Sequence, residues 1–284
     1  MDSLAARTKE LCRLYEIKPA RSKGQNFLIN DGIYQAMIAA ADINKKDTIL
    51  EVGPGLGFLT AALSKKAKRV VAVELDDKLA ALLQIALDSQ GVDNVEIVHQ
   101  DILRFNPDKY FDSGENYRVV ANLPYNITSI FLRTFLSSPR PPRSLVLMLQ
   151  KEVAERICAQ PPKMSLLSLS VQYYGHPQII RTVPASDFWP QPAVDSALLR
   201  FDYLRNKTTK ESLEFDKKFF RLARIGFSAK RKMLKNNLSG GLKLEPEMIT
   251  GALIKVGLQV KARAEDLSVE QWRLLVAAIP DFVL

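Results

Sequence analysis

Residues 48–58, TILEVGPGLGF, combine a short β-branched run, a glycine-rich turn and the start of an apolar helical pattern. Thr48–Val52 is typical of a buried strand, and the apolar spacing of Phe58–Lys65 predicts a helix. Glycine permits positive φ and close approach of the backbone to a ligand, so Gly53–Gly57 predicts a cofactor site at the carboxyl end of the strand. A dinucleotide fingerprint is disfavoured, because only Leu56 separates the second and third glycines. An ordinary tight turn is the alternative.

The same alternation of strand and helix continues along the chain. Further strands are predicted at Arg69–Glu74, Val95–His99, Arg118–Ala121 and Leu145–Leu149. Helices are predicted between them, at Lys78–Ser89 with Asp76 as its N-cap, Ile130–Ser137 and Glu152–Cys158. This pattern indicates an α/β fold with a parallel sheet. Gln178–Val183 and Ser196–Tyr203 follow without a helix between them, which favours a closing antiparallel pair and seven strands in all.

A polar stretch after Leu204 separates the predicted sheet from a region of helical patterns only. These patterns cover Phe215–Leu238, Glu245–Val256 and Val269–Ala278. We therefore expect two domains, residues 1–204 and a small all-helical domain of residues 205–284. Residues 205–284 hold 16 Lys or Arg and 9 Asp or Glu, a net charge of +7 out of +9 for the whole chain. This excess favours contact with a nucleic acid, although a solvated charged face explains the charge equally well.

The composition excludes several classes of protein. The chain has 284 residues, 47% hydrophobic and 25% charged, as expected for a globular protein. No apolar run approaches the roughly 20 residues of a membrane-spanning helix, and no targeting signal follows Met1, so we expect a cytoplasmic protein without membrane contact. Two cysteines and two histidines show no ligand spacing, so we expect reduced thiols and no metal site.

Two acidic residues follow predicted strands at the same edge of the sheet as the glycine turn. Glu74 ends the second strand, about 20 residues beyond the turn, which suits the two hydroxyls of a ribose. Asp101 follows the third strand and can accept a hydrogen bond from an adenine amino group. Each acid alone is equally explained as a solvated strand end or a helix cap. Together with the turn they predict an adenosyl ligand.

The fourth strand ends in Asn122-Leu123-Pro124-Tyr125, the most specific pattern in the chain. An adenine amino nitrogen is a poor nucleophile, so a site that alkylates it must hold it in line with the electrophile. The Asn122 oxygen and a backbone carbonyl near Leu123, beside Pro124 with its missing N–H, can accept from the amino hydrogens. Tyr125 can stack on a base presented out of its helix. The alternative is a proline-bounded turn with a core tyrosine.

These motifs together resemble the KsgA family of ribosomal RNA adenine dimethyltransferases. The resemblance runs nearly end to end and rests on Gly24–Leu28, the glycine turn, Glu74, Asp101, Asn122–Tyr125, Phe188–Pro192 and Val194–Ser196. It implies a Rossmann-like, seven-stranded class I methyltransferase sheet with a small helical C-terminal domain. It also implies the cofactor S-adenosyl-L-methionine.

The resemblance implies a role for each motif residue. Gln25, Asn26 and Leu28 would close over the cofactor, Gly53 and Gly55 would lie beside its methionine part, and Glu74 and Asp101 would bind its ribose and adenine. Asn122 would border both cofactor and target. Phe188 would supply a second aromatic wall opposite Tyr125, with a core phenylalanine as the alternative. The implied reaction is direct in-line methyl transfer to the amino nitrogen, twice per base, without a metal or a covalent enzyme intermediate.

A basic segment, Gly226–Lys232 with Lys235 one turn on, resembles the family's basic helix. Lys230, Arg231, Lys232 and Lys235 are predicted to contact rRNA phosphates, while a solvated surface helix is the alternative.

The region Arg263–Ser268 with Trp272 resembles the housekeeping branch of the family. The implied substrate is two adjacent adenosines near the 3′ end of small-subunit (16S) rRNA, within an immature small subunit, and the enzyme is expected to act as a monomer. Three alternatives remain: a ribosome-assembly factor without catalysis, a large-subunit resistance methyltransferase, and a dinucleotide oxidoreductase.

Overall fold

A computed structural model of the chain describes residues 3–19, 24–204 and 210–279. The chain divides into two compact units, residues 1–154 with 176–203 and residues 155–175 with 204–284. The expected single boundary after Leu204 therefore misses one segment: residues 155–175 group with the C-terminal helices. Of the polar stretch Arg205–Lys210, only Lys210 lies within the described residues, where it begins a helix.

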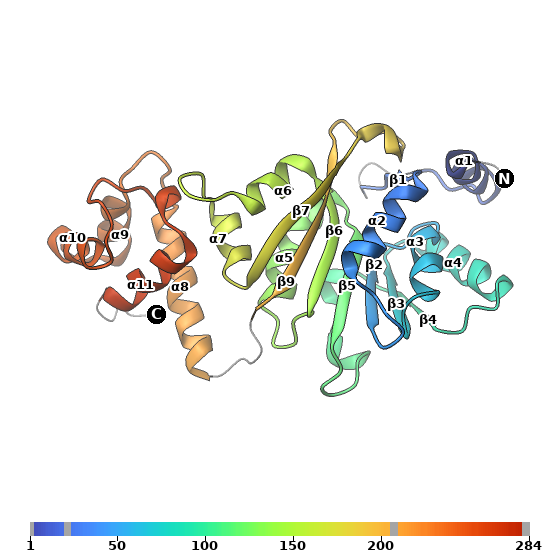
Figure 1. The fold of residues 1–284 in the computed structure, drawn as a ribbon, viewed down its shortest axis with the longest axis horizontal. Coiled ribbons are helices and arrows are strands. Elements are labelled where there is room, and N and C mark those ends of the chain that lie inside the picture. Colours follow the sequence, from blue (N-terminus) through green and yellow to red (C-terminus); the bar gives the residue numbers. More distant parts are fainter. Residues whose placement is uncertain (1–2, 20–23, 205–209, 280–284) are drawn as a thin grey trace. The chain divides into compact units, whose positions relative to one another are not determined.

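The first unit is built on a seven-stranded sheet in the order β4-β3-β2-β5-β6-β9-β7 (Figure 1). Its strands are β2 (Thr48–Val52), β3 (Arg69–Glu74), β4 (Val95–His99), β5 (Tyr117–Asn122), β6 (Ser144–Gln150), β7 (Gly175–Val183) and β9 (Ser196–Tyr203). The first five run parallel, and β9 runs antiparallel to β6. All seven predicted strands are confirmed, most of them to the residue.

Helices cover this sheet and connect its strands. They are α1 (Leu4–Leu14), α2 (Asp31–Ala41), α3 (Phe58–Ser64), α4 (Asp77–Ser89), α5 (Thr128–Leu136) and α6 (Lys151–Cys158), which crosses the boundary between the units. Asp76 caps α4 as predicted, accepting hydrogen bonds from the amides of Lys78 and Leu79. The sequence reading missed α1 and α2. It also missed a two-stranded antiparallel sheet that joins β1 (Phe27–Leu28) to β8 (Phe188–Trp189).

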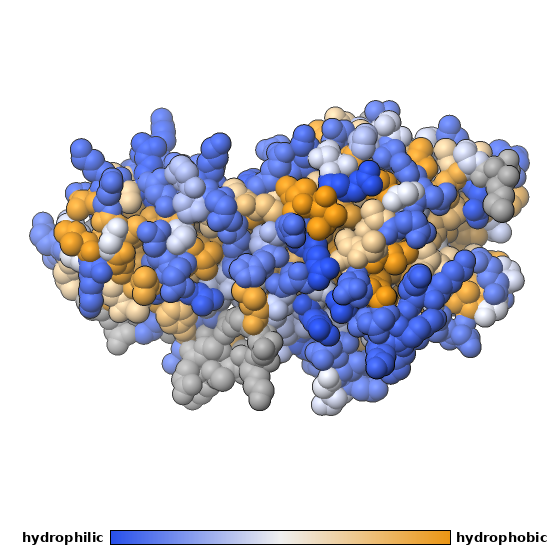
Figure 2. Space-filling view, in the orientation of Figure 1, coloured by the Kyte–Doolittle hydropathy of each residue, from blue (hydrophilic) through white to orange (hydrophobic). Residues whose placement is uncertain are grey.

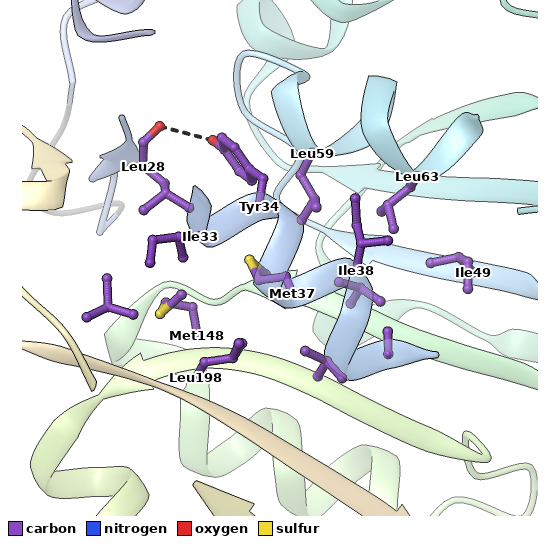
Figure 3. Packing of buried hydrophobic residues seen from close by; sticks show 14 of the residues in the cluster. Leu28, Ile33, Tyr34, Met37, Ile38, Ile49, Leu59, Leu63, Met148 and Leu198 are labelled. Atoms are coloured by element: carbon purple, nitrogen blue, oxygen red, sulfur yellow. Dashed lines mark hydrogen bonds between the residues drawn. The ribbon is translucent and has the colours of Figure 1, made fainter. Parts of the chain in front are cut away.

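Helix α2 anchors the main hydrophobic core of the first unit. It packs on β5, β6 and β9 and on α3, so that Ile33, Met37 and Ile38 meet side chains of the sheet (Figure 3). The Tyr34 hydroxyl donates a 3.0 Å hydrogen bond to the Leu28 carbonyl oxygen, which ties β1 to this helix (Figure 3). Strand β1 is thereby joined to the main core of the first unit.

The second unit is helical in its described part. It contains α7 (Leu166–Gln172), α8 (Lys210–Gly226), α9 (Leu234–Leu242), α10 (Pro246–Lys255) and α11 (Val269–Ala278). Five short 3-10 helices lie within the described residues, at Ile102–Arg104, Pro107–Lys109, Tyr125–Ile127, Ala185–Asp187 and Ala264–Asp266. Figure 2 shows hydrophobic residues scattered among hydrophilic ones on the visible face of this unit.

The single helix predicted over Phe215–Leu238 was wrong, because α8 ends at Gly226 and α9 begins at Leu234. The buried Asn237 side chain supplies the physical reason. Its Nδ2 donates to the carbonyl oxygens of Gly226 (2.7 Å) and Ala229 (3.1 Å), so it satisfies acceptors that a continuous helix would satisfy itself. The Leu234 amide donates instead to the Ala262 carbonyl oxygen, at 2.8 Å.

Candidate active site

A pocket opens at the carboxyl edge of the sheet, where β2 has β3 on one side and β5 on the other. The chain runs outward from β2 through β3 to β4 and then returns to β5, so this is the topological switch point at which ligands bind in open α/β sheets. The predicted residues that line the pocket are Gln25, Asn26, Leu28, Gly53, Gly55, Glu74, Asp101, Asn122 and Pro124. Leu123, Tyr125 and Phe188 are not in its lining.

The glycine turn forms the floor of this pocket. Gly53, Gly55 and Gly57 all have positive φ, between 57° and 81°, which explains why side chains are avoided here. A Cβ at Gly57 would stand 2.4 Å from Leu83 Cδ1, whereas one at Gly53 would meet nothing within 4 Å. The backbone at Gly53 therefore leaves open space toward the pocket, as close approach of a ligand requires.

Glu74 is held rigidly at the end of β3. Its carboxylate accepts three backbone hydrogen bonds, from Gly55 at 3.1 Å and from Leu75 and Asp76 at 2.9 Å. Burial raises the pKa of Glu74, and those three hydrogen bonds oppose the rise. An oriented acceptor with lone pairs to spare thus faces the pocket beside the turn.

Asp101 follows β4 and caps the short helix Ile102–Arg104. Its Oδ1 accepts from the Leu103 amide at 2.9 Å. Its other carboxylate oxygen is left to accept from a ligand in the pocket that the residue lines. Asp101 can therefore cap the short helix and accept a hydrogen bond from a ligand at the same time.

The segment before β1 covers one side of the pocket. Gln25 Nε2 donates to Asp76 Oδ2 at 3.4 Å, and the Asn26 carbonyl oxygen accepts from Asn122 Nδ2 at 3.2 Å. Gly24 has positive φ, and a Cβ there would lie 3.1 Å from Pro124 Cβ. Residues 24–26 thus touch the Asn122–Tyr125 motif directly.

The side-chain amide of Asn122 uses its nitrogen in a hydrogen bond within the protein and leaves its oxygen available to a ligand. Because Nδ2 donates to Asn26, the amide is oriented with Oδ1 as an acceptor that has no hydrogen-bond donor among the described residues. The Leu123 amide donates to the Met148 carbonyl oxygen at 3.3 Å, which fixes the motif on β6. The motif therefore presents oriented oxygen acceptors at the pocket edge.

Tyr125 begins the short helix after Pro124, and its ring is half-buried. Its hydroxyl and the Ser196 hydroxyl are 2.8 Å apart and share a hydrogen bond. Burial raises the pKa of Tyr125, and the hydrogen bond with Ser196 opposes the rise. Ser196 is fully buried at the start of β9. It belongs to the motif Val194–Ser196, but nothing in the sequence indicated that it would contact Tyr125.

Phe188 does not form the second aromatic wall that was expected opposite Tyr125. Its side chain is only 2% exposed and belongs to the core cluster around α2, because pairing of β8 with Leu28 turns it inward. In this structure it packs as a core phenylalanine and offers no open face opposite Tyr125.

Glu51 was missed as a site residue, although it lies within the opening motif. It is 1% exposed and lines the pocket, and its Oε2 has no hydrogen-bond partner among the described residues. Burial raises the pKa of Glu51 to about 8, with the nearby Thr60 hydroxyl opposing the rise and Glu74 adding to it. The signal that could have found it is a carboxylate within an otherwise apolar buried strand.

The basic residues of the second unit are placed differently from the prediction. Lys230, Arg231 and Lys232 lie in the exposed turn between α8 and α9 rather than on a helix, and only Lys235 is helical, in the first turn of α9. The turn is anchored by Phe227, which stacks on the buried Trp272 with ring centroids 5.7 Å apart. Lys230, Arg231 and Lys232 are thus exposed on a loop that the packing of Phe227 on Trp272 holds in place.

The described parts of the chain contain no group of three or more His, Cys, Asp or Glu placed to hold a metal ion. Neither Cys12 nor Cys158 forms a disulfide bond. Within the same residues, every helix is too short or too polar to cross a membrane.

Comparison with known proteins decides the family. Residues 18–281 match the family described as Ribosomal RNA adenine dimethylase. The chain belongs to that family. It is therefore related to methyltransferases that act on rRNA adenines, and the class I methyltransferase fold expected from the resemblance is confirmed.

Named members of the adenine dimethylase family align with nearly the whole chain. Ribosomal RNA small subunit methyltransferase A of Dehalococcoides mccartyi is 43% identical over 273 residues, covering 96% of this chain and 92% of the relative. The protein of the same name from Alkaliphilus oremlandii is 39% identical and covers 97% of each chain.

Solved structures show the same fold. The crystal structure of 23S rRNA methyltransferase ErmE superposes with a TM-score of 0.73 at 25% identity, covering 90% of this chain and all of that one. A dimethyladenosine transferase from Plasmodium falciparum gives a TM-score of 0.72 at 25% identity, covering 88% and 95%.

Proposed function

We propose that this adenine dimethylase family member transfers methyl groups from S-adenosylmethionine to the N6 amino groups of two adjacent adenosines near the 3′ end of small-subunit rRNA, acting as a monomer on an immature subunit. One observation carries the proposal: Asn122, with an oriented and unpartnered oxygen, stands at the switch point beside the glycine turn. Near full-length identity to relatives named for the small subunit favours that substrate.

The pocket suits the proposed cofactor by its chemistry. The open space above Gly53 admits a close ligand, Glu74 offers acceptor oxygens for ribose hydroxyls, and Asp101 offers one for an adenine amino group. When bound, S-adenosylmethionine supplies an electrophilic methyl group next to a positive charge. The unpartnered Oε2 of Glu51 offers a further hydrogen-bonding group in the same pocket.

The Asn122–Tyr125 motif would hold the target base. Asn122 Oδ1 and the Leu123 carbonyl oxygen would accept the two amino hydrogens, which fixes the nitrogen and stabilises the positive charge that develops on it. The Tyr125 ring would stack on the base and offset part of the cost of unstacking it from RNA. The second unit would bind rRNA phosphates through Lys230, Arg231 and Lys232, with Lys235 nearby.

The proposed activity is tested by mass spectrometry of rRNA from immature small subunits incubated with the protein and S-adenosylmethionine. Wild type is expected to yield N6,N6-dimethyladenosine at two adjacent positions. Asn122→Ala is expected to lower the rate at least about 100-fold, the typical cost of losing one transition-state acceptor or donor, while cofactor binding by calorimetry persists. Absence of N6,N6-dimethyladenosine from the small-subunit rRNA, or an undiminished rate for Asn122→Ala, would contradict the proposal.

A further inference from the structure

A second cavity lies against α1 and carries a basic surface that the proposed reaction does not use. Four cationic side chains line it, those of Lys9, Arg13, Lys18 and Lys78, against two acidic ones. All four are exposed. We call this cavity the α1 groove.

Helical spacing places two of these cations side by side. Lys9 and Arg13 are four residues apart on α1, so they project from one face of the helix. The adjacent face of the helix is buried through Leu4, Thr8 and Cys12. The cations of α1 are therefore carried on a packed element.

An aromatic side chain forms part of the groove wall. Trp189 is half-buried: it packs against the apolar cluster that includes Cys12, Ile17 and Phe27, and it also lines the groove. Pairing of Trp189 with Phe27 in the β1–β8 sheet holds it in place. A fixed aromatic surface beside several cations is the combination with which proteins bind single-stranded nucleic acid, since phosphates meet the cations and bases or sugars meet the ring.

The groove adjoins the active-site pocket. Gln25 and Asp76 line both cavities, and the hydrogen bond between their side chains forms the boundary. A strand whose base enters the pocket would extend past this boundary with its backbone among the cations of the α1 groove.

Resting on the function proposed above, we propose that the α1 groove binds the sugar-phosphate backbone of the rRNA strand that carries the target adenosine, with Trp189 contacting that strand. The sheet-bearing unit would thus hold its substrate by its own basic surface as well as by its catalytic pocket. An acidic protein would also match the charge, but the groove shares Gln25 and Asp76 with the pocket proposed to take a nucleobase, and this proximity favours RNA.

The test compares two double variants of equal charge. Lys9→Ala/Arg13→Ala removes two groove cations, and Lys65→Ala/Lys66→Ala removes two exposed cations at the amino end of β3, the opposite sheet edge. Each is titrated with an RNA fragment of the small-subunit 3′ end across a range of salt concentrations. The groove variant is expected to bind several-fold more weakly, with a salt slope smaller by about 1 per residue removed. The control variant is expected to match wild type.

Two further measurements make the outcomes distinct. Cofactor affinity by calorimetry is expected to be unchanged in both variants, and RNA is expected to quench the fluorescence of Trp189, a change that Trp189→Phe removes. Equal RNA affinity and salt slope in the groove and control variants would overturn the proposal. So would a groove variant that binds the RNA fragment normally but loses only its affinity for the precursor subunit, since that result assigns the groove to a protein. If wild type fails to methylate the precursor subunit, the proposed function fails instead.

Discussion

Tyr125 and Ser196 show how a site residue depends on a partner remote in sequence. Their shared 2.8 Å hydrogen bond ties the first turn after Pro124 to the start of β9. The Ser196 hydroxyl is fully buried, so the tyrosine ring is held from its inner end while the rest of it stays half-exposed. This arrangement restricts the ring before any base arrives, which lowers the entropy lost on stacking.

Tyr125→Ala is expected to lower kcat/KM for rRNA methylation by roughly 5- to 150-fold, because base–aromatic stacking contributes about 1–3 kcal/mol. Tyr125→Phe keeps the ring and loses only the hydrogen bond, so it should retain most of the activity, and Ser196→Ala should behave like it. Single-turnover methylation measures all three. Wild-type rates for Tyr125→Ala would remove the ring from the site.

Glu51 makes stability depend on pH. With a pKa raised to about 8 in the folded state, it keeps its proton while the unfolded chain, with the ordinary value of 4.5, has lost it. The free energy of unfolding should therefore fall as pH rises from about 4.5 to 8 and then level off. Glu51→Gln should remove this pH dependence, so the stability of the variant relative to wild type should be greatest at pH 9. Urea unfolding at pH 5, 7 and 9 measures it, with the exposed Glu247→Gln as control; parallel profiles would contradict the assignment.

At the residue scale, the sequence identified the groups whose chemistry is visible in a motif. Glu74, Asp101 and Asn122 all line one pocket, as their positions at the carboxyl ends of parallel strands predict. Glu51 and the Ser196 contact were missed, because each depends on burial and on partners that only the tertiary structure brings together. Phe188 was misjudged for the same reason: β8 pairing decides which way it faces.

At the scale of elements, the strands were predictable and the helix ends were not. A buried parallel strand needs a largely apolar run, which β3 and β5 show in their middle and which β2 shows except at Glu51. The break between α8 and α9 depends instead on Asn237 reaching back to Gly226, which no local pattern reveals. Gly226 itself is required by packing, since a Cβ there would lie 2.4 Å from Trp272 Cη2 and 2.9 Å from Leu234 Cδ1.

Gly226→Ala is expected to destabilise the protein by about 1–3 kcal/mol, the usual cost of forcing an extra methyl group into a packed core. Gly251→Ala is the matched control, because Gly251 lies within α10 and a Cβ there would meet nothing within 4 Å. That change should stabilise the protein by about 0.5–1 kcal/mol through helix propensity. Chemical denaturation measures both; equal effects would show that the Trp272 contact is not limiting.

For the whole molecule, the topology of the sheet determines where the pocket lies, and the distribution of charge determines where the basic surfaces lie. The switch point between β2 and β5 fixes where the pocket lies, and it follows from the strand order of the sheet, whereas the sequence pattern indicated only which segments form strands and that the sheet is parallel. The charge count pointed to the helical region, but the structure adds the α1 groove, whose cations are scattered along the first 78 residues and so escaped a regional count.

Basic surfaces occur in both units, so removing both should have additive effects. Lys230→Ala/Arg231→Ala/Lys232→Ala combined with Lys9→Ala/Arg13→Ala is expected to reduce the salt slope of RNA binding by the sum of the two separate reductions. Filter-binding titrations between 50 and 200 mM salt measure the slopes. A combined variant no different from either parent would mean that only one surface meets RNA.

The pairing of Phe27–Leu28 with Phe188–Trp189 has a consequence for biosynthesis. A ribosome delivers the chain from its first residue, so β1, the strand that forms one wall of the pocket, is made long before its pairing partner β8, which lies more than half the chain length further on. Until Trp189 has left the exit tunnel, a nascent enzyme lacks that wall, and premature termination before this point yields a product that cannot complete its own binding cleft.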